Sequence, residues 1–456
     1  MNGNTSLSSH EGFFNQLRKD EFSRLDNSGQ VYLDYTGGNL YPESLLDQHF
    51  NHLRSHVLGN PHSTNPSSLL STELVQATRT KVLDFFNAPD YHCIFTANAS
   101  AALQIVGECY PFSSESLFLL SADNHNSVNG IREYCKAKGG TFKYCQLNYE
   151  DLTLNEQQIT DNLEQASNYQ NKLFAYPAQS NVSGIKHPLA WIEKAHQNGW
   201  DVLLDAAAFV PTSKLDLTQI KPDFVSISFY KIFGYPTGLG CLLVHKDKFD
   251  KLKKPWFAGG TVKFVSINYP GYFLANDHER FENGTVNYLD IPAISNGLSF
   301  IERIGFERIT ERIKYLIAKL ITDLHQLQHQ NGNPLVRIFG SENLSQKGGT
   351  LIFNLLDPNG NLFSIEEVET KANKKGISLR TGCFCNPGID EINNCISNEE
   401  TAKYFTTKHS GSYHEMIFYL GRMRGAIRIS VGLATTTEDL DCFLEFIKTF
   451  RDKQHI

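Results

Sequence analysis

A lysine at position 231 stands just past a predicted strand, in surroundings that favour covalent chemistry with a carbonyl group. The β-rich run 223–228 precedes it, and a glycine-rich turn and a second apolar run, 241–244, follow it. Neighbouring aromatic and isoleucine side chains should desolvate the amine, which lowers its pKa and makes it a nucleophile. A further short strand, 201–205, ends in the carboxylate of Asp205. A lysine and an aspartate at two strand ends suit pyridoxal phosphate (PLP), because the lysine forms the Schiff base while the aspartate pairs with the pyridine nitrogen and keeps the ring an electron sink.

The phosphate group of PLP needs backbone N–H donors at the start of a helix, where the helix dipole also favours an anion. The run 96–102 fits, because a strand is followed by small residues and then by a helical pattern. Ser228 is a second donor for the phosphate, and His125, just past a strand, is placed to stack on the ring. Small residues at helix starts are common and a lone histidine is more often a polar loop residue, so these features gain their meaning from Lys231 and Asp205.

A second reactive segment spans residues 378–388, where glycine and proline predict an exposed loop. Cys383 and Cys385 lie in it beside Arg380, and an electropositive neighbourhood favours the thiolate form of cysteine. Arg428 lies in an apolar strand, where a buried arginine needs a partner: a substrate α-carboxylate held through two hydrogen bonds or, equally, a structural salt bridge. No second pair of ligands stands at a suitable spacing from the two cysteines, so we predict no metal site.

The composition excludes several classes of protein. A chain of 456 residues, 41% hydrophobic and 20% charged, predicts a globular protein of two or three domains. A net charge of −7 without a basic stripe argues against nucleic-acid binding, and no apolar run approaches the ~20 residues of a membrane span. The polar N-terminus lacks a signal-peptide core, and the nine cysteines are scattered through apolar runs. We therefore expect a cytoplasmic, reducing compartment with mostly buried thiols.

The elements that must position these residues alternate between strands and helices, which predicts an α/β fold with a parallel core. Long helical stretches at 291–304 and 306–330 indicate a change of domain, and residues 390–424 form a loop-rich excursion with some helix. We expect an N-terminal segment (1–30), a large PLP-binding domain (31–290) and a small C-terminal domain with the cysteine loop (291–456). Strands are expected at 31–34, 93–96, 116–120, 172–175, 201–205, 223–228, 241–244, 350–354 and 425–430, and further helices at 69–86, 98–106, 364–375 and from 438.

With these motifs in place, the chain resembles the class V, fold-type-I PLP enzymes of the cysteine desulfurase group. It is most similar to the desulfurase-like domain of the molybdenum cofactor sulfurases. The resemblance implies a large mixed-sheet PLP domain with helices on both faces, plus a smaller α+β C-terminal domain. It runs through nearly the whole chain, in family order, at residues 32–34, 59–63, 95–96, 124–128, 176–181, 204–208, 228–240, 259–261, 280–285 and 380–388.

The resemblance implies the cofactor contacts residue by residue. Lys231 forms the Schiff base, and Asp205 pairs with the pyridine nitrogen. His125 stacks on the ring and moves protons, and Asn181 lies near the 3′-oxygen of PLP and the substrate carboxylate. The phosphate positions are Ser100, Ser228 and, from the neighbouring subunit of a homodimer, Thr285.

The resemblance also implies the substrate and the path of its sulfur. L-cysteine is held by Asn181, Arg380 and Arg428, Lys231 removes its α-proton, and alanine is released. The sulfur passes to Cys385 as a persulfide. Geometry does not choose between the two loop cysteines, since residues two apart share a face of an extended segment, so the choice of Cys385 over an auxiliary Cys383 comes from the resemblance.

Three departures from the family qualify this picture. Ala208 stands where the wider group has a glutamine that touches the 3′-oxygen, and Tyr230 precedes the lysine where histidine is common. The second domain of the full-length sulfurases is not part of these 456 residues, so we expect a separate sulfur acceptor, either a protein or the molybdenum cofactor. Two alternatives remain open: another class V aminotransferase, epimerase or lyase, and a non-catalytic PLP-fold partner subunit.

Overall fold

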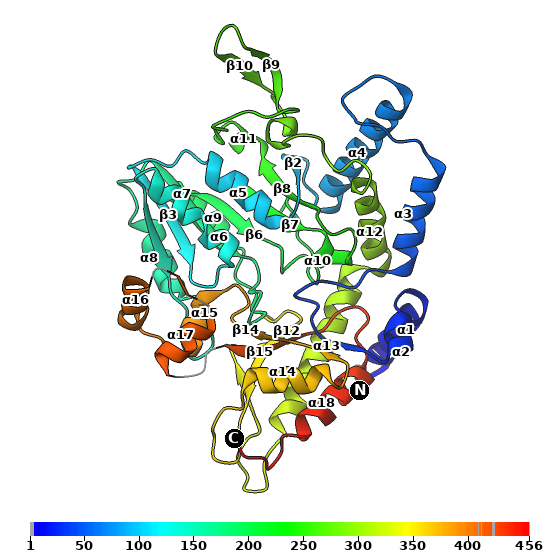
Figure 1. Ribbon diagram of the computed structural model, residues 1–456, viewed down its shortest axis with the longest axis vertical. Coiled ribbons are helices and arrows are strands. Elements are labelled where there is room, and N and C mark those ends of the chain that lie inside the picture. The colour runs from blue at the N-terminus through cyan, green and yellow to red at the C-terminus, as the bar shows by residue number, and fades with distance from the viewer. Residues whose placement is uncertain (1–3, 409, 412, 422–424, 456) are drawn as a thin grey trace.

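A seven-stranded mixed β-sheet forms the centre of the larger half of the molecule (Figure 1). The structure is a computed structural model and describes residues 4–408, 410–411, 413–421 and 425–455. The strand order is β2-β8-β7-β6-β5-β3-β4, and β8 alone runs opposite to its neighbours in this sheet. The strands are β2 (Tyr91–Thr96), β3 (Ser116–Ser121), β4 (Thr141–Cys145), β5 (Asn171–Pro177), β6 (Asp201–Asp205), β7 (Phe224–Ser228) and β8 (Gly240–His245).

The reversed strand β8 corrects the expectation of an all-parallel core and confirms the mixed sheet that the family resemblance implies. Only residues 229–239 connect β7 to β8, and their helix α10 (Tyr230–Phe233) is a single turn. A parallel connection needs a crossover of about a dozen residues or more, usually a helix. The short connection therefore returns the chain antiparallel, and it holds Lys231 at the edge where the parallel strands end.

Helices cover both faces of the sheet, as expected. Along β3, Phe118 and Leu120 belong to the core formed with α5 (Ala99–Cys109) and α7 (Ile131–Ala137), while Leu117 and Leu119 belong to the core on the other face. This alternation follows from the two-residue period of a strand. The other helices of this half are α3 (Glu43–Ser55), α4 (Pro66–Phe85), α6 (Asn126–Asn129), α8 (Glu156–Glu164), α9 (Trp191–Gln197), α11 (Lys246–Phe249) and α12 (Ile291–Ile304).

A four-stranded antiparallel sheet, in the order β11-β12-β15-β14, organises the smaller half. The side chains of Ser364 and Thr436 cap α14 and α18, which is why these helices begin close to their predicted starts. The excursion 390–424 is more helical than expected, apart from residues 409, 412 and 422–424, which lie outside the described residues. The elements are α13 (Phe306–His325), β11 (Val336–Phe339), β12 (Thr350–Leu355), α14 (Ile365–Asn373), β14 (Arg380–Gly382), α15 (Pro387–Asn393), α16 (Asn398–Thr407), α17 (Tyr413–Leu420), β15 (Ala426–Ser430) and α18 (Thr437–Lys448).

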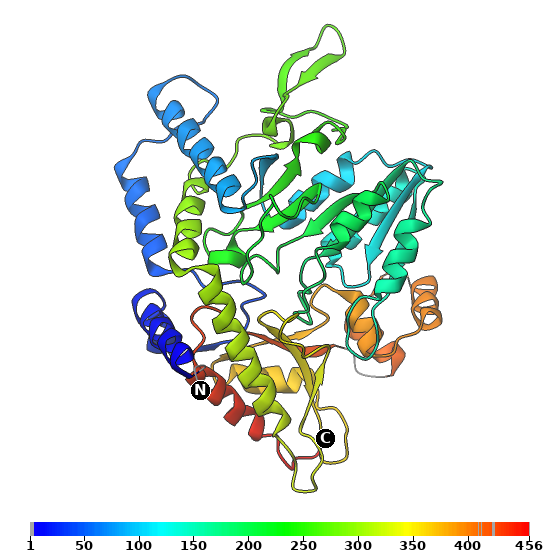
Figure 2. The ribbon, with the colours of Figure 1, turned by 180° about the vertical axis from the view of Figure 1, so that it is seen from behind.

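The start of the chain is attached to its end. Helices α1 (Asn4–Glu21) and α2 (Arg24–Ser28) lie beside α13 and α18 in both views (Figures 1 and 2). Arg18 on α1 is buried and donates to the Asp439 carboxylate at 2.6 Å. Strand β1 (Val31–Tyr32) then pairs with β13 (Ile377–Ser378), which brings the following residues of the chain alongside β15.

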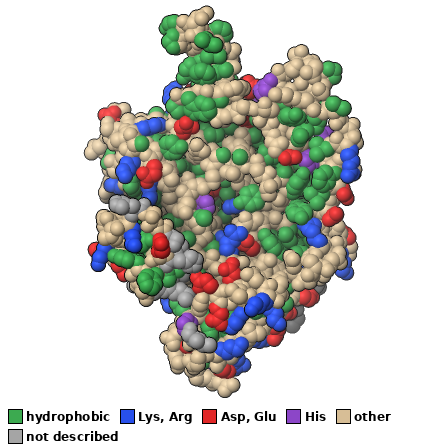
Figure 3. Space-filling model, in the orientation of Figure 1, with side chains coloured by type: hydrophobic (Ala, Val, Ile, Leu, Met, Phe, Trp, Pro, Cys, Tyr) green, Lys and Arg blue, Asp and Glu red, His purple; other side chains and the backbone are tan. Residues whose placement is uncertain are grey.

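A hairpin of β9 (Val262–Ser266) and β10 (Gly271–Leu274) projects from the larger half, and hydrophobic side chains cover it (Figures 1 and 3). Phe264, Ile267 and Phe273 are among its most exposed side chains. Contiguous exposed apolar surface of this kind marks an interaction site. Among the described residues, no helix has both the length and the apolar character needed to cross a bilayer.

Candidate active site

A cleft of about 300 Å³ opens where β3, β5, β6 and β7 end. In open α/β sheets the carboxyl ends of parallel strands are where ligands bind. Six side chains proposed from the sequence for the cofactor line this cleft: Ser100, His125, Asn181, Asp205, Ser228 and Lys231. The ends of five different strands and the connections that follow them supply these residues, so the fold gathers residues spread over more than 130 positions.

Lys231 projects into the cleft from α10, one turn after β7. Burial lowers the pKa of its amine, the nearby Asp205 carboxylate opposes this shift, and Arg428 and Arg380 add to it. A lowered pKa increases the fraction of the free amine, which is the form that attacks a carbonyl or accepts a proton.

Asp205 ends β6 with its carboxylate held in place. Its Oδ1 accepts hydrogen bonds from the Ser226 hydroxyl at 2.9 Å and from the Ala207 N–H at 3.1 Å. Its Oδ2 makes no hydrogen bond with any residue that the structure describes. This oxygen is available for a protonated ring nitrogen.

His125 caps α6 and reaches the same cleft. Its Nδ1 accepts the Ser127 N–H at 3.1 Å, so the proton of the neutral ring lies on Nε2. Burial lowers the pKa of the imidazole, with smaller contributions from Lys231 and Arg428, and Asp205 opposes them. A lowered pKa favours the neutral form of the ring, which can stack on an aromatic cofactor.

The N-terminus of α5 provides a cradle for an anion. Asn98 caps the helix by accepting the Ala101 N–H at 3.0 Å, and Ser228 Oγ accepts the Ala99 N–H at 2.9 Å. Between them, the Ser100 N–H has no acceptor within the described part of the chain, and the Ser100 hydroxyl lies 2.6 Å from that of Ser127. With the amine, the free carboxylate oxygen and the neutral imidazole, this donor set fits PLP at each of its ends.

Thr285 lies outside this cleft. It is exposed and accepts a hydrogen bond from the Asn60 side chain at 3.2 Å. Within one chain it therefore does not reach the anion cradle, and its assignment to a neighbouring subunit's phosphate stays a prediction.

The two predicted substrate arginines are cross-strand neighbours, since Arg380 on β14 pairs with Arg428 on β15. Both bind one carboxylate, that of Asp34. Asp34 Oδ2 accepts from Arg380 Nη2 at 2.6 Å, and Asp34 Oδ1 accepts from Arg428 Nη2 at 2.9 Å. Arg428 is 3% exposed, and its Nε is buried without a partner among the described residues. Asp34 was given no role from the sequence, although it ends a predicted strand just as Asp205 does.

The cysteine loop has an unusual backbone. Phe384 and Cys385 both have φ near 55°, in the left-handed region that costs a residue with a side chain about 1–2 kcal/mol. Two hydrogen bonds hold this conformation: Asn126 N–H donates to the Cys385 carbonyl at 2.7 Å, and Asn181 Nδ2 donates to the Phe384 carbonyl at 2.9 Å. Cys385 is exposed and Cys383 half-buried. Such outliers concentrate at active sites, where the surrounding structure over-determines them.

A buried polar network anchors the end of this loop, and sequence reasoning missed it. Asn386 donates to Asp123 Oδ1 at 2.7 Å, and His187 Nε2 lies 2.7 Å from Asp123 Oδ2. Asn386 and Asp123 are both fully buried. No group of three or more His, Cys, Asp or Glu side chains that could hold a metal ion occurs in the described part of the chain.

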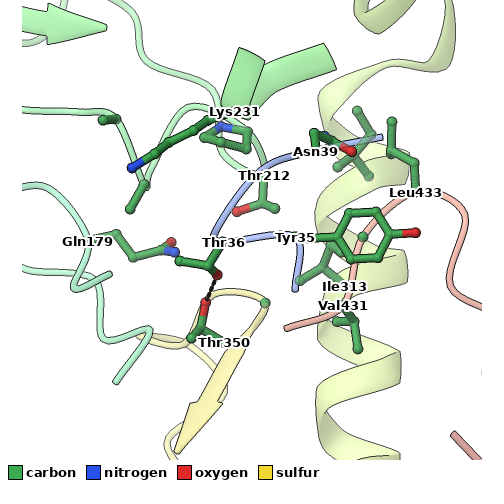
Figure 4. Close-up of a pocket in the computed structure, with 16 residues that line it drawn as sticks. Tyr35, Thr36, Asn39, Gln179, Thr212, Lys231, Ile313, Thr350, Val431 and Leu433 are labelled. Carbon is green, nitrogen blue, oxygen red and sulfur yellow. Dashed lines mark hydrogen bonds between the residues drawn. The ribbon is translucent and has the colours of Figure 1, made fainter. Parts of the chain in front are cut away.

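A second, smaller cavity of about 30 Å³ lies behind Lys231 and between the two halves (Figure 4). Lys231 and Gln179 lie on one side of it, and Ile313, Val431 and Leu433 on the other. Gln179 and Ala208 line both cavities, and Gln179 Oε1 is buried without a partner among the described residues. The space beside Ala208 is therefore next to the Gln179 side chain, whose amide oxygen has no partner among the described residues. Position 208 is where the wider family has its glutamine.

Known proteins match both the sequence and the fold. The family model "Aminotransferase class-V" matches residues 31–443. The human molybdenum cofactor sulfurase is 38% identical over 96% of the chain and 51% of its own length, and that of Arabidopsis thaliana is 36% identical over 95% and 57%. The cysteine desulfurase from Thermococcus onnurineus superposes with a TM-score of 0.78 at 23% identity, covering 95% of this chain and 97% of that one. The chain thus spans about half the length of the curated relatives that it matches.

Proposed function

The chain belongs to the aminotransferase class-V family, and we propose that within this family it is a PLP-dependent cysteine desulfurase. It would convert L-cysteine to L-alanine and carry the sulfur on Cys385. The observation that supports this most directly is the attachment of the cysteine loop to the lysine cleft: Asn181 lines the cleft and donates to the Phe384 carbonyl of the loop.

Each end of the cofactor has residues to hold it. Lys231 would bind it covalently, Asp205 Oδ2 would accept the ring N–H, and Ser100 and Ser228 would hold the phosphate with the first turn of α5. When bound, PLP withdraws electrons from the α-carbon of an amino acid. The half-buried His125 would cover the ring and exclude water from it.

The chain's own residues then divide the reaction between them. Arg428 and Arg380 would hold the substrate carboxylate, as charge-assisted bonds from guanidinium groups do. The lowered pKa of Lys231 leaves it able to take the α-proton and return it. Cys385 Sγ, as thiolate, would attack the substrate sulfur: the new S–S bond forms, the carbon–sulfur bond breaks, and its electron pair stays on carbon, which is protonated to give alanine.

The names of the relatives suggest the destination of the sulfur. Two of them are molybdenum cofactor sulfurases that are about twice as long as the matched region. We propose that the sulfur passes to an acceptor, a protein or the molybdenum cofactor itself. We also propose a homodimer, supported by the exposed position of Thr285 outside its own cleft and by the exposed apolar hairpin β9–β10. The five buried free cysteines support the further proposal of a reducing, cytoplasmic location.

The test combines colour, product and adduct. Purified protein with added PLP should show a visible absorption band that Lys231→Ala lacks, and L-cysteine should yield alanine and a persulfide on Cys385 by mass spectrometry. Conversion of cysteine to a keto acid without alanine would favour the aminotransferase alternative. A wild-type protein that stays colourless with PLP would contradict the proposal.

A further inference from the structure

The carboxylate of Asp34 sits between the two arginines that the proposed function assigns to the substrate. It accepts hydrogen bonds from Arg380 Nη2 and Nε at 2.6 and 3.2 Å and from Arg428 Nη2 at 2.9 Å. Its side chain is 13% exposed, against 3% for Arg428 and 51% for Arg380. One carboxylate thus already accepts hydrogen bonds from both guanidinium groups in the absence of substrate.

Three segments of the chain build this contact: β14, β15 and the stretch that contains Asp34 and Gly37. Arg380 and Arg428 share a face of the β14–β15 pair, and Asp34 bridges to Ser430 on the adjacent edge of β15. Gly37 supplies the space, because a Cβ there would overlap both the Asp34 carboxylate and the Arg380 guanidinium. Burial lowers the pKa of Arg428 and Asp34 opposes the shift, so Asp34 acts as the counter-ion of a nearly buried charge.

The remaining donors are available to a substrate. A guanidinium carries five N–H donors, and Asp34 uses two from Arg380 and one from Arg428. Arg428 Nη1 donates to the Asn181 carbonyl at 2.9 Å, while its Nε is buried and has no partner in the described part of the chain. An arriving carboxylate can therefore bind the remaining N–H groups of Arg380 and the second N–H groups of Arg428 Nη1 and Nη2 without displacing Asp34, while the buried Nε lies out of its reach.

The charges set how many carboxylates the site accepts. Two arginines carry two positive charges, and Asp34 cancels one of them. A single substrate carboxylate cancels the other, whereas a second one would meet a neutral cluster and the like charge of Asp34. We propose, on the basis of the function proposed above, that Asp34 is a specificity-determining residue that restricts the site to amino acids with one carboxylate.

The test is a binding measurement that does not depend on turnover. The visible spectrum of the PLP-loaded protein is titrated with L-alanine, which has one carboxylate, and with L-aspartate, which has two. The ratio of the two dissociation constants, aspartate over alanine, should be well above one in the wild type and should fall about tenfold in Asp34→Asn, the effect of one partly screened charge pair.

Two controls separate charge from shape. Asp34→Glu keeps the charge and should keep the wild-type ratio within about threefold. Asp250→Asn removes a carboxylate that accepts from Arg280 at 2.9 Å outside the cleft, and should leave both constants unchanged.

The outcomes are distinct. If Asp34→Asn changes both dissociation constants by the same factor, or neither, Asp34 has no role in selectivity and the inference is overturned while the proposed function stands. If the wild type has no visible band with PLP, the proposed function fails and the inference fails with it. A ratio that falls in Asp34→Asn and not in Asp34→Glu supports both.

Discussion

Replacing Asn386 with alanine should release the cysteine loop without unfolding the protein. The two N–H groups of its carboxamide serve three acceptors: Asp123 Oδ1 at 2.7 Å, the Asp123 carbonyl at 3.1 Å and Asn181 Oδ1 at 3.2 Å. The alanine variant loses them all. Asp123 keeps His187 and Ser180 as partners, so its buried carboxylate does not become unpaired.

The magnitude follows from the bonds lost. Each of the two N–H groups is counted once: the one on the carboxylate contributes about 2 kcal/mol and the other, shared between two neutral acceptors, about 1 kcal/mol, so about 3 kcal/mol of loop stability goes with the side chain. The left-handed residues Phe384 and Cys385 already oppose the closed loop by about 1–2 kcal/mol each. Since 1.4 kcal/mol is a factor of ten, the open population of the loop should rise about a hundredfold.

Hydrogen exchange measured by mass spectrometry reports the open population of the cysteine loop. Peptides covering residues 382–389 should exchange about a hundredfold faster in Asn386→Ala, while peptides of the central sheet keep their wild-type rates. Asn331→Ala is the control, because that exposed side chain donates to the Pro358 carbonyl far from the loop. Exchange within threefold of wild type at 382–389 would refute the claim that this network holds the loop.

Three further predictions test the sulfur carrier, the assembly and a buried charge. Cys385→Ala should abolish persulfide formation and alanine release while leaving the visible PLP spectrum intact, and Cys383→Ala should keep part of the turnover; mass spectrometry that finds the persulfide on Cys383 alone would reverse the assignment. Light scattering should report a dimer, and Thr285→Val should weaken PLP binding; a fully active monomer at micromolar concentration would contradict a shared site. Burial lowers the pKa of Lys347 from 10.5 to about 8. Between pH 8 and 10.5 the amine is protonated in the unfolded chain but not in the folded one, so stability rises with pH. The wild-type free energy of unfolding, measured by urea titration, should gain about 3 kcal/mol over this range relative to Lys347→Met. A difference between the two proteins that stays flat with pH would show that the amine is not desolvated.

The residues that could be found from the sequence are those whose role is set by local pattern. Lys231 and Asp205 each come after a short, largely apolar run, and parallel strands bring their carboxyl ends to one edge, so the pattern alone predicts their proximity. Asn98 caps α5 and Ser364 caps α14 through their own neighbours. In these cases the determining contacts lie within a few residues of each other.

The residues that were missed depend on distant partners. Asp34 meets Arg428 across 394 positions, and Asn386 meets Asp123 across 263. Neither pairing leaves a trace in the spacing of nearby residues. Helix α1 was missed for a related reason: its polar composition hides that Arg18 is buried against Asp439 at the other end of the chain.

Asn181 connects the two parts of the reaction that the sequence could only assign separately. Its backbone carbonyl accepts from Arg428 Nη1 at 2.9 Å, and its side chain donates to Phe384 and accepts from Asn386. The Arg428 guanidinium also lies 4.8 Å from the centre of the Phe384 ring. A carboxylate that draws on Arg428 therefore acts on the same residues that hold Cys385 in its left-handed conformation. In the proposed function, a substrate carboxylate bound by Arg428 would therefore be coupled through Asn181 to the position of Cys385, because Asn181 is one of the residues that hold the left-handed conformation of the loop.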